Sequence, residues 1–328
     1  VGYLRTADRI MQWSWLGYQT LKPVSIFRSI NVNFNQAKVW DFGGSNLLDC
    51  ANINLSLFFK NYWIFGAGTN RNFEGLSTNE LRGGPAMVWP GNWSNWISLQ
   101  TDSRKSIYLV LDGDFSRGDG GAFRSENYSG NIVFKPTNAL QLLVGASVSL
   151  NKNALQYVDT VKYNNDPRYI FAEIEQKTVA LTVRLDFTIT PDLSIEFYGQ
   201  PFISAGKYFD FKRITTPRAE RFNDRFHTFT ANEINFNANE ELYYFDENKD
   251  GHFDYTVAQP NFNFQQFRSN LVIRWEYKPG STIFLVWSQG KTERLSNGNF
   301  SFSNDIRDLF KAIPHNVFLL KFSYRFNF

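Results

Sequence analysis

An oxygen-rich run of side chains near residue 250 is the pattern in this sequence with the clearest potential for chemistry. Carboxylate and amide oxygens recur at near-alternate positions, and Gly251 follows at the sixth position, which lets a chain curl around a hard cation as calcium loops do. The candidate ligands are Asp246, Asn248, Asp250 and Asp254. Val257 stands at the twelfth position, where such loops carry Glu, so Asp254 would have to replace that ligand. The sequence suggests a Ca²⁺ site; the alternative is an acidic turn that bonds its own backbone.

No other motif for catalysis or cofactor binding stands out. The chain carries no nucleophile elbow, phosphate-binding loop or metalloprotease motif. Its three His residues, His227, His252 and His315, all fall in segments expected to be long loops. Cys50 is the single Cys, so an internal disulfide is excluded. We therefore assign no catalytic residue and expect no enzymatic activity.

A second acidic cluster comprises Asp112, Asp114 and Asp119 among several Gly residues. Its spacing matches no ligand pattern. We interpret it as a solvated extracellular hairpin loop.

The elements that must position these loops are strands in which apolar and polar residues alternate. In the last segment, alternate positions from Phe318 to Phe328 are apolar or aromatic, and the positions between them are polar. The same period of two recurs in residues 140–150, 178–189 and 271–277. Many such strands in series, with charges on the inner face, predict an all-β fold, an antiparallel transmembrane β-barrel.

The alternation assigns side chains to the two sides of this barrel. The residues expected to contact lipid are Val179, Leu181, Val183, Leu185, Phe187, Phe322, Tyr324 and Phe326. The residues expected to face the lumen are Arg184, Asp186, Arg268, Arg274, Glu276, Lys321 and Arg325. Because both signs of charge mix, the lumen is as compatible with internal ion pairs as with a selective pore.

Composition agrees with a barrel and excludes other classes. Aromatic residues make up 17% of the 328 residues, yet the mean hydropathy is −0.36. No run of about 18 apolar residues occurs, so a helical membrane span is excluded. The formal net charge is only +3 and basic residues are scattered, so nucleic acid is not an expected partner.

The turns between strands give a topology. Short Pro- and Gly-containing turns alternate with longer connections, which in barrels lie on the periplasmic and extracellular sides. The longest connections are residues 206–260 and residues 291–316, the latter with a short helix starting at Ser303. About 13 strands result. Because bacterial barrels usually have even strand numbers, we expect residues 1–328 to be the C-terminal part of a larger barrel whose first strands precede Val1.

Several stretches carry a family resemblance. They are Leu4-Arg5-Thr6-Ala7-Asp8, Arg82-Gly83-Gly84-Pro85-Ala86, Tyr198-Gly199-Gln200-Pro201-Phe202, residues 260–289 around Arg274-Trp275-Glu276-Tyr277, and the terminal Lys321-Phe322-Ser323-Tyr324-Arg325-Phe326. Together they resemble the C-terminal barrel of a Bacteroidota outer-membrane family of unknown function. That barrel usually follows a carbohydrate-binding family 9-like domain. The resemblance implies such an upstream domain and no catalytic residue.

These patterns lead to a set of functional hypotheses. The terminal aromatics Tyr324, Phe326 and Phe328 resemble the signal read by the outer-membrane insertion machinery. We expect a protein of the Gram-negative outer membrane, in contact with lipid, with that machinery and with other envelope proteins. The first hypothesis is a channel or a structural subunit of an envelope complex. Glycan handling through the upstream domain is the alternative, and a barrel hydrolase is the weakest.

Overall fold

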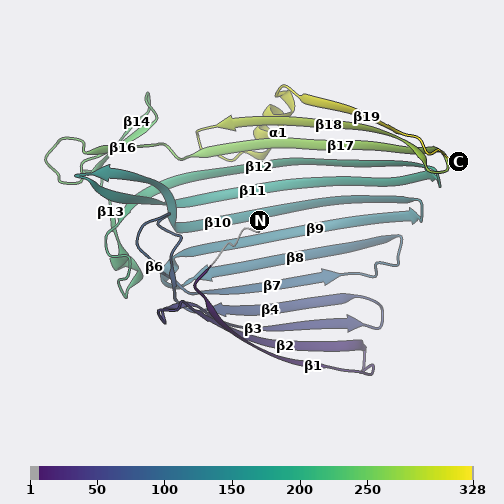
Figure 1. The fold of residues 1–328 in the computed structure, drawn as a ribbon, viewed down its shortest axis with the longest axis horizontal. Helices are drawn as coiled ribbons and strands as arrows, with labels where there is room; N and C mark the ends of the chain where they lie inside the picture. Colours follow the sequence, from purple (N-terminus) through teal and green to yellow (C-terminus); the bar gives the residue numbers. More distant parts are fainter. Residues whose placement is uncertain (1–6, 327–328) are drawn as a thin grey trace.

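The computed structural model describes residues 7–326, and a single large antiparallel sheet dominates them (Figure 1). Thirteen of its strands pair in an unbroken row, always with the next large strand along the chain. They are β1 (Ile10–Gln19), β2 (Phe27–Trp40), β3 (Asn46–Phe59), β4 (Ile64–Asn72), β7 (Asn92–Gln100), β8 (Ile107–Gly118), β9 (Phe123–Thr137), β10 (Leu140–Tyr163), β11 (Asp166–Thr190), β12 (Leu193–Ile214), β17 (Phe262–Lys278), β18 (Ser281–Leu295) and β19 (His315–Ser323). The prediction of an all-β, antiparallel fold is confirmed.

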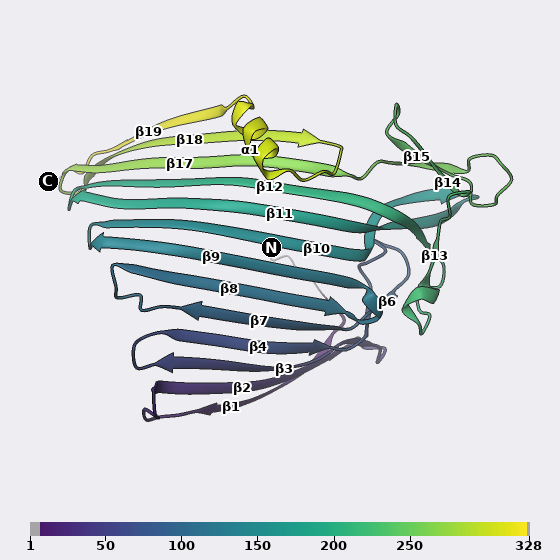
Figure 2. The ribbon, with the colours of Figure 1, turned by 180° about the vertical axis from the view of Figure 1, so that it is seen from behind.

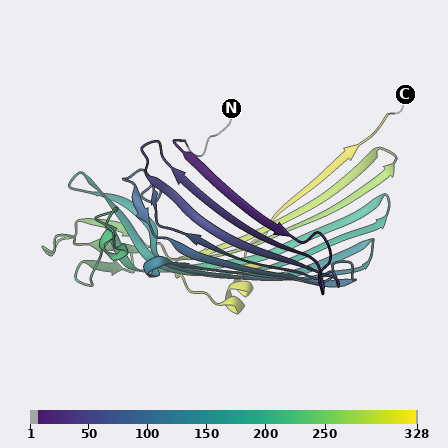
Figure 3. The same cartoon turned by 90° about the horizontal axis from the view of Figure 1, so that it is seen from below.

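The sheet is an open gutter rather than a closed barrel. β1 and β19 are its two edges, and within residues 7–326 neither pairs with the other. Figure 3 shows the sheet bent into a trough whose two edges rise on the same side. Every neighbouring pair in the row is antiparallel, so the first and the thirteenth strands run in the same direction.

The two faces of the gutter differ in chemistry. The only α-helix in the described part of the chain, α1 (Phe302–Lys311), lies on the convex face (Figures 2 and 3), where Phe310 packs on Phe267 with ring centroids 5.3 Å apart. Strand alternation and pairing register then place every other sheet residue on the same face. One convex row crosses six neighbouring strands: Leu142, Leu185, Phe197, Leu271, Trp287 and Phe318. The convex face is therefore an apolar belt.

The two ends of the gutter also differ. At one end the strands join through short turns such as Lys278-Pro279-Gly280-Ser281, where Gly280 adopts a φ of 77° that favours glycine. At the other end lie the long connections, with β5 (Gly75–Ser77) paired to β6 (Met87–Trp89) and a second sheet of β14 (Ile234–Asn237), β15 (Leu242–Phe245) and β16 (Tyr255–Ala258). We call them the turn end and the loop end.

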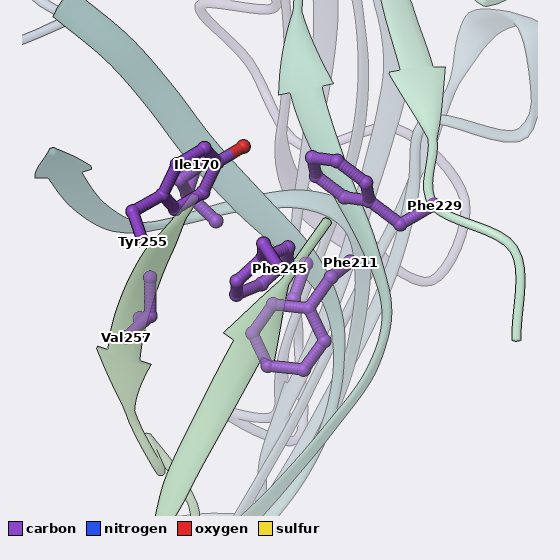
Figure 4. Close-up of a cluster of buried hydrophobic side chains, with 7 residues drawn as sticks. Ile170, Phe211, Phe229, Phe245, Tyr255 and Val257 are labelled. Atoms are coloured by element: carbon purple, nitrogen blue, oxygen red, sulfur yellow. The ribbon is translucent and has the colours of Figure 1, made fainter. Parts of the chain in front are cut away.

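β10, β11 and β12 project past the other strands at the loop end and carry a small core there. Ile170 and Phe211 of the main sheet pack against Phe229, Phe245 and Tyr255 (Figure 4). The Phe229 and Phe245 rings lie 4.8 Å apart, and both side chains are buried. This core fixes the position of the second sheet beside the extended strands.

The two longest connections differ in detail from their expected bounds. β12 continues to Ile214, so the connection expected to begin at residue 206 begins at residue 215, and it then forms η2 (Phe222–Arg225) and β13 (Phe226–Thr228). Residues 291–316 contain α1, but β18 runs on to Leu295 and the helix N-cap is Ser301 rather than Ser303. A 3-10 turn, η1 (Asp119–Gly121), links β8 to β9.

Candidate functional site on the concave face

Six of the seven charged residues expected in a lumen lie on the concave face, in β11, β17 and β19, whereas Arg325 lies beyond the end of β19. Asp186 is paired in register with Glu196, and Arg268 with Gln200, on the face opposite α1. Arg184 binds Asp186 at 3.2 Å, and Arg274 binds Glu276 at 2.7 Å. Within residues 7–326 neither Arg268 nor Lys321 forms an ion pair with a carboxylate. This half of the face therefore combines two internal ion pairs with two cations that face the open trough.

The β1–β9 half of the concave face is polar without being strongly charged. Asn side chains at alternate positions of neighbouring strands form a cross-strand hydrogen-bond ladder. Asn35 Nδ2 donates to Asn52 Oδ1 at 2.8 Å, and Asn54 Nδ2 donates to the same oxygen at 2.7 Å. Farther along, Asn72 donates to Asn92, which donates to Ser94. We call this the amide ladder. It covers the sheet with groups that hydrate readily.

Two Trp rings lie flat on this ladder. Trp96 Nε1 donates to Asn54 Oδ1 and Trp15 Nε1 donates to Asn33 Oδ1, each at 3.2 Å. Trp96 lies over Gly66, where a Cβ would come within 2.7 Å of the ring. Glycine is thus needed at this strand position, because any side chain would lift the ring.

Most of this surface was not predicted, although the sequence carries a signal for it. Asn recurs at positions 31, 33 and 35, at 52 and 54, and at 70 and 72, which is the period of two that puts them on one face. The interpretation of Asp112 and Asp114 as loop residues is wrong, since both lie within β8. Asp112 accepts hydrogen bonds from Ser98 and Ser129 and so joins the ladder.

The loop end contains two buried charged centres that the sequence did not indicate. Arg225 is fully buried and donates to the carbonyls of Val88, Ala219 and Glu220 and to the Glu74 carboxylate. Glu247, at 10% exposure, accepts from Arg168, Arg213 and the Tyr255 hydroxyl. The Arg225 centre joins residues 73–91 to residues 215–261, and the Glu247 centre ties residues 215–261 to β11 and β12; both roles are structural.

The loop proposed for calcium is ordered by its own hydrogen bonds. Asp246 accepts the backbone N–H groups of Asp250 and Gly251, and Asp254 accepts those of Glu247 and Asn248. The N–H of His252 and then the side chain of Asn248 lower the pKa of Asp250. In the described residues no three His, Cys, Asp or Glu side chains are grouped to hold a metal ion. The geometry favours the acidic turn, and calcium binding stays a prediction.

Calcium titration with limited proteolysis tests that prediction. If the loop binds Ca²⁺, protection of residues 215–261 should rise with half-maximal effect at about 10⁻⁴–10⁻³ M, as in weak extracellular sites. Asp250→Ala should abolish the effect, whereas Asp224→Ala, an acidic change in η2 outside the motif, should keep it. Equal cleavage of the wild type with and without Ca²⁺ would leave an ordinary acidic turn.

The terminal aromatic signal is described only in part. Tyr324 and Phe326 pack edge to face with ring centroids 4.7 Å apart, and Phe326 is 71% exposed. Arg325 lies at the turn end, where its backbone N–H donates to Ser281 Oγ. Phe328 and the Leu4–Thr6 part of the family resemblance lie outside the described residues.

Fold and site together define the class: an all-β protein built on one large antiparallel sheet with an apolar convex face and a polar concave face. In residues 7–326 no helix is long and apolar enough to cross a membrane. The chain belongs to the family described as a domain of unknown function, DUF5916, whose model matches residues 1–328. No curated protein matches it.

Proposed function

We propose that this sheet is the wall of a transmembrane β-barrel in a Gram-negative outer membrane and that it acts as a channel for hydrophilic solutes. The observation that carries the proposal is the separation of the two faces. An apolar belt that continues across six strands needs a covering layer, and lipid supplies one. The amide ladder and the concave charges, in contrast, suit contact with water.

Closure of the barrel is part of the proposal. An open edge strand leaves a row of backbone N–H and C=O groups unpaired, which is costly inside a bilayer. Because β1 and β19 run in the same direction, an odd number of added strands between them restores antiparallel pairing throughout. The total would then be even, as in most bacterial barrels. The terminal aromatics would direct insertion by the outer-membrane machinery.

Planar-bilayer recording of the full chain tests the channel. We expect discrete current steps, and we expect Arg268→Glu, which reverses an unpaired concave charge, to shift the reversal potential toward cation selectivity. Lys60→Glu, the same charge reversal in a turn-end connection, should leave it unchanged. Inserted protein that passes no current would contradict the channel and favour a structural subunit, with partners that co-purify in mild detergent.

Glycan handling is the second candidate, supported by the two Trp rings on the amide ladder. Flat aromatic faces beside amide groups provide the apolar surface and the hydrogen bonds that sugar rings use. Membership of a Bacteroidota family with an upstream carbohydrate-binding domain would add to this candidate. Block of the channel current by a neutral oligosaccharide, lost in Trp96→Ala, would support it. We propose no catalytic activity.

A further inference from the structure

A row of basic side chains crosses the convex face just beyond the apolar belt, toward the loop end. Arg117 of β8 lies directly opposite Arg124 of β9, and Arg124 lies directly opposite Lys152 of β10. Two further Lys residues, Lys177 of β11 and Lys207 of β12, extend the row. We call these five residues the basic row. On β10 and β11 the next convex residues toward the turn end begin the belt, Leu150 after Lys152 and Val179 after Lys177, whereas on β9 Glu126 intervenes between Arg124 and the belt.

Like charges directly opposite each other destabilise a sheet, so this arrangement needs a compensating partner. Carboxylates supply part of this compensating negative charge. Glu126 binds Arg124, and Glu173 and Glu175 bind Lys152 at 2.8 and 3.1 Å. In residues 7–326 no carboxylate forms an ion pair with Arg117, Lys177 or Lys207, and all three side chains are exposed. The row thus retains positive charge.

The basic row borders a cavity. A cavity of about 450 Å³ is lined by four basic residues, Arg124, Lys152, Lys177 and Lys207, and by two carboxylates, Glu126 and Glu175, with Phe300 as another part of its wall. Phe300 belongs to the segment between β18 and α1, and the Lys177 Nζ lies 4.6 Å from its ring centroid. That segment passes close to β12 at Gly298, where a Cβ would come within 2.7 Å of the Gly206 carbonyl. Leu150 lines the same cavity, so the cavity extends from the basic row into the apolar belt.

We propose that this cavity binds the phosphorylated headgroup of an outer-leaflet lipid, whose acyl chains then run along the apolar belt. The inference rests on the proposed membrane-spanning function. The cavity joins positive charge to apolar surface at the level where headgroup and chains meet, and ammonium and guanidinium groups are strong donors to phosphate oxygens. A bound phosphate would offset the repulsion between Arg124 and Lys152, which both line the cavity.

Native mass spectrometry of the full chain released from nanodiscs tests the proposal. The discs contain phosphatidylcholine with a small fraction of bisphosphorylated lipid A. Lys177→Gln/Lys207→Gln should weaken lipid A retention by about 30-fold, given about 1 kcal/mol for each basic side chain near a membrane surface. Lys22→Gln/Lys60→Gln, with the same loss of charge in turn-end connections, should retain lipid A like the wild type.

Each other outcome overturns the inference. Equal retention of dephosphorylated lipid A would assign binding to the belt alone, and competition by millimolar inorganic phosphate would assign the site to a free anion. Equal retention by the two double variants would remove the basic row from the interaction. Failure of the wild type to insert into phosphatidylcholine discs would overturn the membrane proposal itself, whereas insertion without selective retention overturns only this inference. Heat-dependent gel mobility confirms that each variant is folded.

Discussion

Val183→Arg should destabilise the protein folded in a bilayer by about 2–4 kcal/mol, the cost of an Arg at the centre of a barrel exterior. Val183 lies on the convex face, paired with Val144 on one side and Gly199 on the other. Its side chain is 37% exposed and lies within the apolar belt. If lipid covers this face, an Arg at this position must be taken out of water. Urea titration of the protein folded into liposomes measures the loss.

The adjacent residue provides the matched control for this prediction. Thr182 lies on the concave face beside Gln200, so the side chain of Thr182→Arg should reach water, and its effect should stay below about 1 kcal/mol. Similar losses for both variants would argue against a lipid-covered convex face. Equal tolerance of both variants would also argue against a lipid-covered convex face, because it would mean that water reaches either side of the sheet.

Arg225→Met should separate two connections of the loop end, residues 73–91 and residues 215–261, at a cost of about 3–5 kcal/mol, the range for breaking a buried charged interaction. The variant keeps an unbranched stem that reaches about as far as the Arg Nε, but it lacks the guanidinium and leaves the Val88, Ala219 and Glu220 carbonyls without their donor. Hydrogen exchange at the Val88 amide, which donates to the Pro217 carbonyl, should accelerate strongly. Amides in β17 and β18 should keep their protection.

Arg221→Met is the control for local charge and composition. Arg221 is exposed and lies four residues before Arg225 in the same connection. Its substitution should change Val88 exchange little, because exposed side chains contribute little to stability. Equal acceleration in both variants would show that the connection is held by features other than the Arg225 hydrogen bonds.

The sheet could be predicted from the sequence because its signals are local. Alternation in segments such as residues 178–189 has a period of two, and turns such as Lys278-Pro279-Gly280 mark the ends of strands, so face assignment and strand number follow. The side-chain positions of Arg184 and Arg268 on one face depend only on this period. The amide ladder could have been found in the same way.

The loop end could not be predicted because its interactions join distant parts of the chain. Arg225 meets Glu74 across 151 residues, and Glu247 meets Arg168 across 79. Nothing in the neighbourhood of either residue marks it as buried. The length of β12 was underestimated for a related reason: residues 207–214 lie beyond the start of β17 and pair with β11 and, from Lys212 to Ile214, with the short strand β13, which the sequence did not indicate.

The pairing of β12 with β17 determines where the length of such a protein can vary in evolution. Gly206 is in register with Phe262, and the ladder runs from there to Leu193 and Trp275 without a shift. The connection of residues 215–261 thus joins two strands that are already neighbours, and the entropy of closing such a loop grows only slowly with its length. Evolution could lengthen, shorten or exchange this segment while the wall keeps its register. Grafting a foreign epitope between these two strands would use the same tolerance.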